Sequence, residues 1–197
     1  MFTSKSLSKT NGEFYLDTLS RIFNEDIFKK IDSLAFDLKD AWLNKKNIFI
    51  CGNGGSAANA IHIANDFLYG AGACGEGPRL PGLKVESLTS NQAVLTCLAN
   101  DVGYENIFSH QLNVKGNSGD ILIALSGSGN SKNIINALEI SKKIGIISHA
   151  ILGFKGGDCL KKCDNAIYFP VDDMQIAEDT QLIVSHICMQ WLTKNKP

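Results

Sequence analysis

The sequence predicts an α/β protein with a doubly wound parallel sheet. Beyond residue 46, short apolar runs rich in β-branched residues alternate with segments of helical spacing. This alternation is typical of a parallel sheet with helices on both faces. Before residue 46 the pattern is amphipathic and helical instead. We therefore expect one domain over residues 1–197, with N-terminal helices at 1–46 and an α/β core at 47–197.

The N-terminal pattern predicts two amphipathic helices within residues 13–44. Leucine, isoleucine and phenylalanine recur there three and four positions apart, which places them on one helix face. The segment Asn24-Glu25-Asp26 is expected to separate the two helices, because Asn and Asp favour helix caps over helix interiors.

The core pattern predicts its elements in a regular order. The expected strands are residues 47–51, 84–88, 120–126, 147–154 and 165–171. The expected helices are residues 56–69, 91–112 with a break near 101–103, 131–144, 156–163 and 176–193. The Gly- and Pro-rich segment "GAGACGEGPRLPG", residues 70–82, is expected to be a long loop. Such a loop is either a lid or a disordered connection.

The charge balance argues against a polyanionic partner. The 19 basic and 20 acidic residues give a net charge of -1, with no long run of either sign to follow a nucleic acid or an anionic membrane. No stretch of about 18 apolar residues is present, and the N-terminus lacks a continuous apolar signal segment. We therefore expect a cytoplasmic protein. The six cysteines form no CxxC pair and are expected to be reduced thiols.

Two loops rich in glycine, serine and asparagine follow the first and third expected strands. Ligands of open α/β sheets bind outside the carboxyl ends of the strands. In the second loop, "SGSGNSK", Gly127 and Gly129 permit a tight turn. Serine hydroxyls lie there at the start of a helix whose free N–H groups attract an anion. The serines are Ser126, Ser128 and Ser131.

The loop pattern favours a phosphate over a nucleotide. A single loop of this kind is equally well explained by a turn with an ordinary serine cap. Two such loops in one chain, each between a strand and a helix, favour phosphate binding. Neither loop matches the nucleotide-binding patterns GxxxxGK[ST] and GxGxxG.

A possible metal-binding pair follows the first loop. His62 and Asp66 are four residues apart on the expected helix, so their side chains lie on one face. A histidine and a carboxylate at this spacing can chelate one metal ion. Taken alone, such a pair more often forms a hydrogen bond or salt link along the helix.

Three segments resemble the sugar isomerase (SIS) domain and, within it, the phosphoheptose isomerases. They are "CGNGGSAANAIH", "LIALSGSGNSKNI" and "AEDTQLIVSH". The resemblance implies a five-stranded, flavodoxin-like parallel sheet, an N-terminal helical pair packed between subunits, and a homotetramer with active sites at subunit interfaces. It also implies conversion of sedoheptulose 7-phosphate to D-glycero-D-manno-heptose 7-phosphate, which supplies heptose for surface lipopolysaccharide.

The resemblance implies a substrate site by position. The phosphate would be held by Ser126, Gly127, Ser128 and Ser131. The sugar hydroxyls would be contacted by Asn53, Gly54, Gly55, Ser56, Asn100 and Asp101. For the segment "LANDVGYENIFSHQL", which contains Asn100 and Asp101, a helix break capped by Asn or Asp remains the alternative.

The resemblance also implies a bound metal, zinc or another divalent ion, with one ion per subunit. In the family, two zinc ligands are a His and a Glu, which align with His62 and Asp66. The other two are a Gln and a His eight residues apart, which align with Glu178 and His186. Both changes keep an oxygen donor. Eight residues of helix rise about 12 Å, so Glu178 and His186 reach one ion only if Glu178 lies at a loosened helix start. Asp179 is the neighbour that could replace Glu178.

The implied reaction assigns roles to these residues. An aldose–ketose isomerase needs a base, an acid and a group that stabilises the enediolate oxygen. By resemblance, Asp66 is the base and His186 moves a proton to or from oxygen, while Glu178 is the alternative base. Two other functions remain open: a non-catalytic sugar-phosphate sensor or tetrameric adaptor, and an isomerase of a different sugar phosphate.

Overall fold

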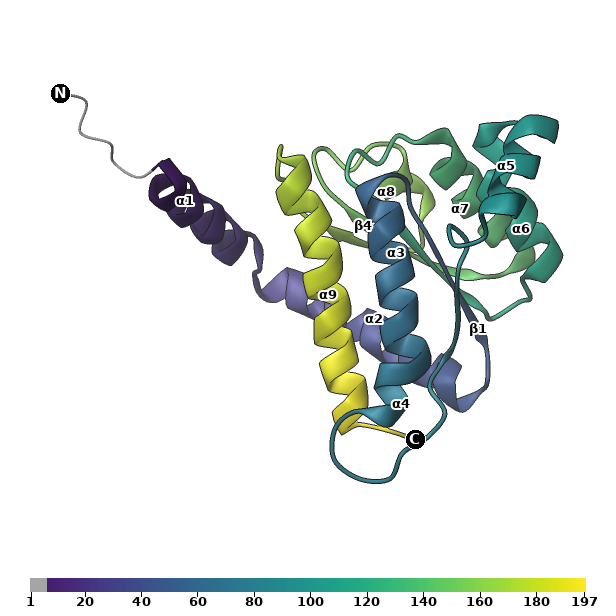
Figure 1. Ribbon diagram of the computed structural model, residues 1–197, viewed down its shortest axis with the longest axis horizontal. Helices are drawn as coiled ribbons and strands as arrows, with labels where there is room; N and C mark the ends of the chain where they lie inside the picture. Colours follow the sequence, from purple (N-terminus) through teal and green to yellow (C-terminus); the bar gives the residue numbers. More distant parts are fainter. Residues whose placement is uncertain (1–6) are drawn as a thin grey trace.

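A parallel sheet lies at the centre of the computed structural model, which describes residues 7–197, with side chains from residue 10 (Figure 1). Within these residues five strands form the sheet, in the order β2-β1-β3-β4-β5. The strands are β1 (Asn47–Cys51), β2 (Lys84–Ser87), β3 (Ile121–Ser126), β4 (Ile147–Leu152) and β5 (Asn165–Tyr168). Every neighbouring pair is parallel.

Helical segments surround the sheet. They are α1 (Leu7–Ile22), α2 (Glu25–Leu43), α3 (Gly55–Asn65), the π-helical turn η1 (Asp66–Gly70), α4 (Ala71–Ala73), α5 (Gln92–Asp101), the 3-10 turn η2 (Tyr104–Asn106), α6 (Ile107–Lys115), α7 (Lys132–Ile144), α8 (Cys159–Lys162) and α9 (Met174–Lys194). No helix among the described residues is long and apolar enough to span a bilayer.

The sheet is buried on both faces. Ile48 and Ile50 of β1 pack into a core with α2, α3 and α9, whereas Phe49 packs into the opposite core with α6 and α7. Successive side chains of a strand point to opposite faces, so a strand covered on both sides is apolar throughout. The predicted doubly wound α/β class is confirmed.

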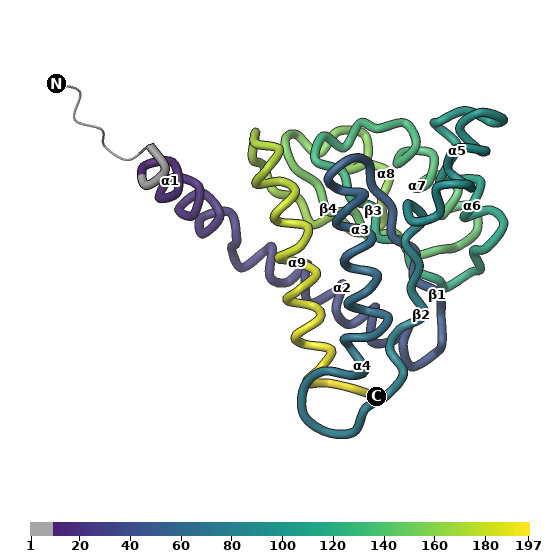
Figure 2. The backbone as a smooth tube through the Cα atoms, viewed as in Figure 1, coloured from purple at the N-terminus to yellow at the C-terminus, as the bar shows by residue number. Residues whose placement is uncertain are grey.

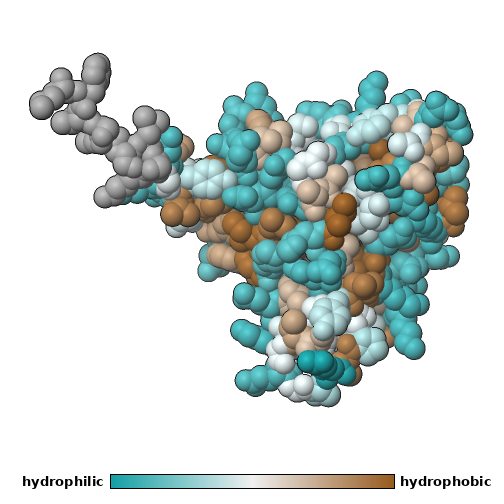
Figure 3. All heavy atoms as spheres, viewed as in Figure 1, coloured by the Kyte–Doolittle hydropathy of each residue, from teal (hydrophilic) through white to brown (hydrophobic). Residues whose placement is uncertain are grey.

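The N-terminal helices divide where predicted. Asn24 begins α2, and its side-chain oxygen accepts a hydrogen bond from the Ile27 N–H at 3.0 Å, which satisfies one of the free donors at a helix start. Helix α1 projects away from the sheet, as Figures 1 and 2 show, and Phe14 and Leu16 are exposed on it. Apolar side chains also gather near its junction with the body (Figure 3).

The main differences from the predicted elements lie at glycine-rich segments. Helix α8 begins at Cys159 rather than at residue 156, because Gly156 and Gly157 have φ values of +73° and +53°. The expected loop at 70–82 begins as helix through Ala73. The rest of that loop is held in place, since the Leu80 N–H donates to the Gly72 carbonyl at 3.1 Å.

The chain order places a crevice between β1 and β3. The chain leaves β1 toward β2 on one side of the sheet, and β3 continues to β4 on the other. In an open α/β sheet the loops that follow two such strands separate and leave room for a ligand at their carboxyl ends.

Candidate active site

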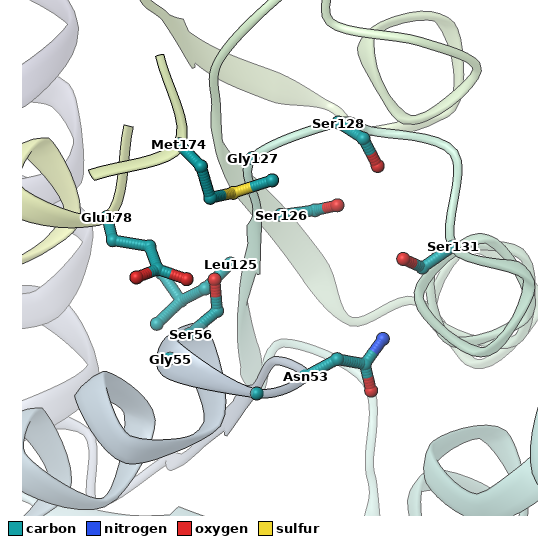
Figure 4. A pocket seen from close by; sticks show the side chains of 11 residues that line it. Asn53, Gly55, Ser56, Leu125, Ser126, Gly127, Ser128, Ser131, Met174 and Glu178 are labelled. Carbon is teal, nitrogen blue, oxygen red and sulfur yellow. The ribbon is translucent and has the colours of Figure 1, made fainter. Parts of the chain in front are cut away.

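A cavity of about 250 Å³ opens at the carboxyl ends of β1 and β3 (Figure 4). It brings together side chains from two loops that are more than 70 residues apart in the sequence, and the start of α9. The lining residues are Asn53, Gly54, Gly55, Ser56, Leu125, Ser126, Gly127, Ser128, Ser131, Met174 and Glu178. Both predicted loops therefore form one site, although the sequence analysis expected neither Leu125 nor Met174 there.

The loop between β3 and α7 presents hydroxyl donors. Ser126 Oγ accepts a hydrogen bond from the Gly129 N–H at 3.0 Å, and Ser128 Oγ accepts one from the Asn130 N–H at 3.3 Å, so both hydroxyl hydrogens remain free to donate. Ser131 is the N-cap of α7, but its hydroxyl caps no helix N–H. Among the described lining residues there is no Lys or Arg. An anion here is held by neutral donors and the start of α7.

Backbone hydrogen bonds from the segment between β4 and α8 hold this loop in its conformation. The Gly153 N–H donates to the Gly127 carbonyl, and the Cys159 N–H donates to the Gly129 carbonyl, both at 3.0 Å. Gly129 has a φ of +68°, and a Cβ there would overlap the Gly156 carbonyl. The loop is therefore ordered before any ligand arrives, which lowers the entropy cost of binding.

A buried glutamine joins the first loop to α9. Gln181 is fully buried; its Nε2 donates to Ser56 Oγ at 2.9 Å, and its Oε1 accepts from Asn59 Nδ2 at 3.0 Å. Asn59 Nδ2 also approaches the Glu178 carbonyl at 3.0 Å. Together these bonds hold α3 against α9. No local sequence pattern pairs Gln181 with Ser56, so the sequence alone does not predict this role of Gln181.

Three polar side chains converge where α3 and α9 pack together. His62 Nε2 lies 3.1 Å from His186 Nε2, and each nitrogen lies 3.4 Å from Asp66 Oδ2. These residues form a group whose donor atoms could hold one metal ion. Asp66 opens the π-helical turn η1, in which the Ala71 N–H bonds to the Asp66 carbonyl. Such turns inside α-helices are frequent at functional sites.

The spacing of these atoms matches a metal site. Zinc binds His nitrogen and carboxylate oxygen at about 2.0–2.1 Å, so two donors of a tetrahedral ion lie about 3.3–3.4 Å apart. The three observed separations, 3.1, 3.4 and 3.4 Å, match one face of such a tetrahedron. The side chain of Asp66 is 23 % exposed and those of the two histidines about half exposed, so a substrate can reach the group.

Glu178 lies apart from this group. Its carboxylate lies over Gly55, where an added Cβ would overlap the carboxylate atoms, and it lines the serine cavity instead. Asp179 points elsewhere, because Asp179 Oδ2 accepts a hydrogen bond from the Tyr15 hydroxyl at 2.6 Å. Burial raises the pKa of Tyr15, and the Asp179 carboxylate raises it further. The structure therefore gathers three of the four predicted metal ligands.

Asn100 and Asp101 lie outside the cavity lining. Both are exposed at the end of α5, where Asn100 Nδ2 donates to Asp101 Oδ1 at 2.7 Å. Their segment reaches the cavity through Tyr104, whose hydroxyl donates to Asn53 Oδ1 at 2.9 Å. Tyr104 is a second residue that the sequence analysis did not single out.

Comparison with known proteins agrees with this geometry. The sequence model of the SIS domain family matches residues 14–153 of this chain. The chain belongs to the SIS domain family. A phosphoheptose isomerase of Aneurinibacillus thermoaerophilus is 38% identical over 83% of this chain and 80% of its own. One of Thermodesulfovibrio yellowstonii is 41% identical over 83% and 81%.

A solved SIS-domain structure shares the fold. The phosphoheptose isomerase GmhA of Neisseria gonorrhoeae superimposes with a TM-score of 0.84 at 24% identity, covering 93% of this chain and 95% of its own. The family resemblance inferred from the loop sequences is thus confirmed, and so is its branch of phosphoheptose isomerases.

Proposed function

We propose that this SIS-domain protein is a phosphoheptose isomerase that converts sedoheptulose 7-phosphate to D-glycero-D-manno-heptose 7-phosphate. One observation carries the proposal: a serine-lined anion cavity and a His/Asp/His group occur together in a chain that is 38% and 41% identical to phosphoheptose isomerases. A sugar-phosphate sensor or an adaptor needs the cavity but has no use for the His/Asp/His group. We place the reaction in the cytoplasm, where it supplies heptose for lipopolysaccharide.

The substrate phosphate is bound at the start of α7. The hydroxyls of Ser126, Ser128 and Ser131 and the first N–H groups of the helix donate to its oxygens. Gly127 lets the side chain of Met174 pack against this loop, because a Cβ at Gly127 would lie 2.7 Å from Met174 Sδ. Asn53 and Ser56, across the cavity, contact the sugar hydroxyls together with the backbone of Gly54 and Gly55.

His62, Asp66 and His186 hold the metal, which we assign as zinc, one ion per subunit. A bound divalent ion stabilises negative charge that develops on the carbonyl oxygen. Asp66 is shorter than the family's Glu, yet Asp66 Oδ2 already lies 3.4 Å from both histidine nitrogens. The shorter side chain therefore reaches the group.

The proton transfers use side chains of the same group. Asp66 Oδ1 has only a 3.5 Å contact with Asn65 Nδ2, so it takes the proton from C1 of the ketose and returns it to C2. His186, which lies beside Asp66, moves the hydroxyl proton from O1 to O2. Glu178 lines the serine cavity instead, where its carboxylate accepts a hydrogen bond from a hydroxyl of the sugar chain.

The assembly we propose is a homotetramer in which α1 and α2 pack between subunits. Phe14 and Leu16 on α1 are 70% and 68% exposed, and Phe36 on α2 is 60% exposed. Exposed apolar side chains on a helix that projects from the body, and on the helix that follows it, are typical of a protein interface.

The reaction is tested directly with sedoheptulose 7-phosphate and zinc-loaded protein in D₂O. We expect the aldose 7-phosphate to appear by NMR with deuterium at C2, because the carried proton exchanges with solvent. Ligand-induced shifts without any aldose, in protein of full zinc content, would support a sensor instead.

The metal assignment predicts a selective loss on histidine replacement. His62→Ala and His186→Ala should each weaken zinc binding by more than about 100-fold, because ligand loss costs more than loss of a supporting group. Equilibrium dialysis with plasma mass spectrometry measures this. His110→Ala, an exposed histidine of α6 outside the group, is the control. Unchanged zinc in all three variants would contradict the assignment.

The separation of Glu178 from the His/Asp/His group predicts different losses at the two carboxylates. Glu178→Gln should keep zinc and most of the turnover, whereas Asp66→Asn should lose both. Asp66→Glu, which restores the family residue, should keep both. Single-turnover rates and metal content measure this, with Asp179→Asn as the neighbouring control. Loss of zinc in Glu178→Gln would place Glu178 among the ligands, and a loss of turnover by about 100-fold or more with zinc retained would make Glu178 the base.

The assembly predicts a mass about four times the 21.4 kDa of one chain in light scattering. Leu16→Glu should dissociate the tetramer, because it places a charge in an apolar interface. Val114→Glu, at an exposed position of α6, should not. A wild-type protein that remains monomeric would refute the assembly.

A further inference from the structure

Tyr104 connects the 3-10 turn η2 to the rim of the cavity. Its hydroxyl donates to Asn53 Oδ1 at 2.9 Å. Asn53 also pairs with Asn133 of α7: Asn53 Nδ2 donates to Asn133 Oδ1 at 2.9 Å, and Asn133 Nδ2 donates to Asn53 Oδ1 at 2.8 Å. Two side chains from separate segments, Tyr104 and Asn133, thus bond to the amide of Asn53, which lines the cavity.

The direction of every hydrogen bond in this network is determined. The backbone N–H of Ile134 donates to Asn133 Oδ1 at 2.9 Å, and a backbone N–H can only donate. Asn133 Oδ1 is therefore an acceptor, which makes Asn53 Nδ2 the donor in the pair. Asn53 Oδ1 must then accept, so the Tyr104 hydroxyl is the donor. Neither amide can turn over without placing two donors or two acceptors together.

This arrangement leaves one N–H of Asn53 free. Nδ2 carries two hydrogens, and Asn133 takes one. In Figure 4 the amide nitrogen of Asn53 lies on the side of Ser131, toward the serine loop. Both acceptor positions of the Asn53 oxygen are occupied, by Asn133 and by Tyr104. The amide of Asn53 can therefore offer the cavity a donor and no acceptor.

The segment that carries Tyr104 is itself fixed. Asn136 of α7 donates through Nδ2 to the Glu105 carbonyl at 2.9 Å and approaches Asn106 Oδ1 at 3.3 Å. Helix α7 thus holds Asn53 in two ways, directly through Asn133 and indirectly through η2 and Tyr104. Asn133 is buried and its Oδ1 also accepts from the Ile134 N–H, so it holds the Asn53 amide from one side. The Tyr104 hydroxyl adds a bond from another direction, which further limits rotation of that amide.

We propose that Tyr104 is a positioning residue, whose hydroxyl holds the Asn53 amide so that its free N–H donates to a hydroxyl of the bound sugar phosphate. This role rests on the proposed isomerase function. Since a fixed donor loses little freedom on binding, Tyr104 strengthens substrate binding without touching the reacting carbons.

The test compares Tyr104→Phe, Asn53→Ala and the double variant. Tyr104→Phe should raise KM about 3- to 10-fold, the loss of one hydrogen bond, and change kcat less than about twofold. In the Asn53→Ala background Tyr104→Phe should have no further effect, because the two act through one amide. Ser109→Ala, which removes a hydroxyl bond to the Asn106 carbonyl at 3.2 Å, is the matched control and should leave KM unchanged.

A readout that needs no activity separates this proposal from the proposed function. The side-chain amide signals of Asn53 in ¹H–¹⁵N NMR spectra, assigned by their loss in Asn53→Ala, should shift in ligand-free Tyr104→Phe and stay in place in Ser109→Ala. Unshifted signals, or additive KM effects in the double variant, would overturn the positioning role. Shifted signals in a protein that does not isomerise sedoheptulose 7-phosphate would uphold the contact and refute the proposed function.

Discussion

The site depends on the packing of α3 against α9. The donor atoms of His62 and Asp66 come from the continuous α3–η1 segment, and that of His186 comes from α9. Their separations of 3.1–3.4 Å tolerate little relative sliding of the two helices. A buried amide fixes that relation, because Gln181 bonds both Ser56 and Asn59. Sliding would break these bonds and leave buried polar groups unpaired, which is costly.

The spacing of apolar residues explains why the strands and helices could be predicted from the sequence. The strands are apolar throughout because both faces are covered, and their positions agree with the predicted ones within a few residues. The place of the serine loop at the cavity was also predictable, because its glycines and serines act locally on their own turn. His62 and Asp66 share a helix face by spacing alone, so their proximity required no tertiary information.

Contacts between distant segments explain what the sequence did not predict. Gln181 is 125 residues from Ser56, and Tyr104 is 51 residues from Asn53. No periodicity marks a polar side chain for such a partner. Glu178 shows where alignment to the family misled. The alignment made Glu178 a metal ligand, whereas the helical rise of about 12 Å between Glu178 and His186 argued against that role. Its carboxylate lies at the serine cavity, as the rise suggested.

The position of Glu178 raises an electrostatic problem, since the cavity to which we assign the phosphate contains a carboxylate and no Lys or Arg among its described lining residues. Two unit negative charges about 8 Å apart repel by about 2 kcal/mol at an effective dielectric constant of about 20. A negative charge at a helix N-terminus gains about 0.3–1 kcal/mol, and up to about 2 kcal/mol when partly buried.

Glu178 lies over Gly55 at the start of α3, whereas Ser128 and Ser131 lie across the cavity near the start of α7 (Figure 4). Each negative group thus has its own helix N-terminus, and the two gains together offset part of the repulsion. The phosphate is thereby directed to α7, and the sugar chain extends from there toward Glu178.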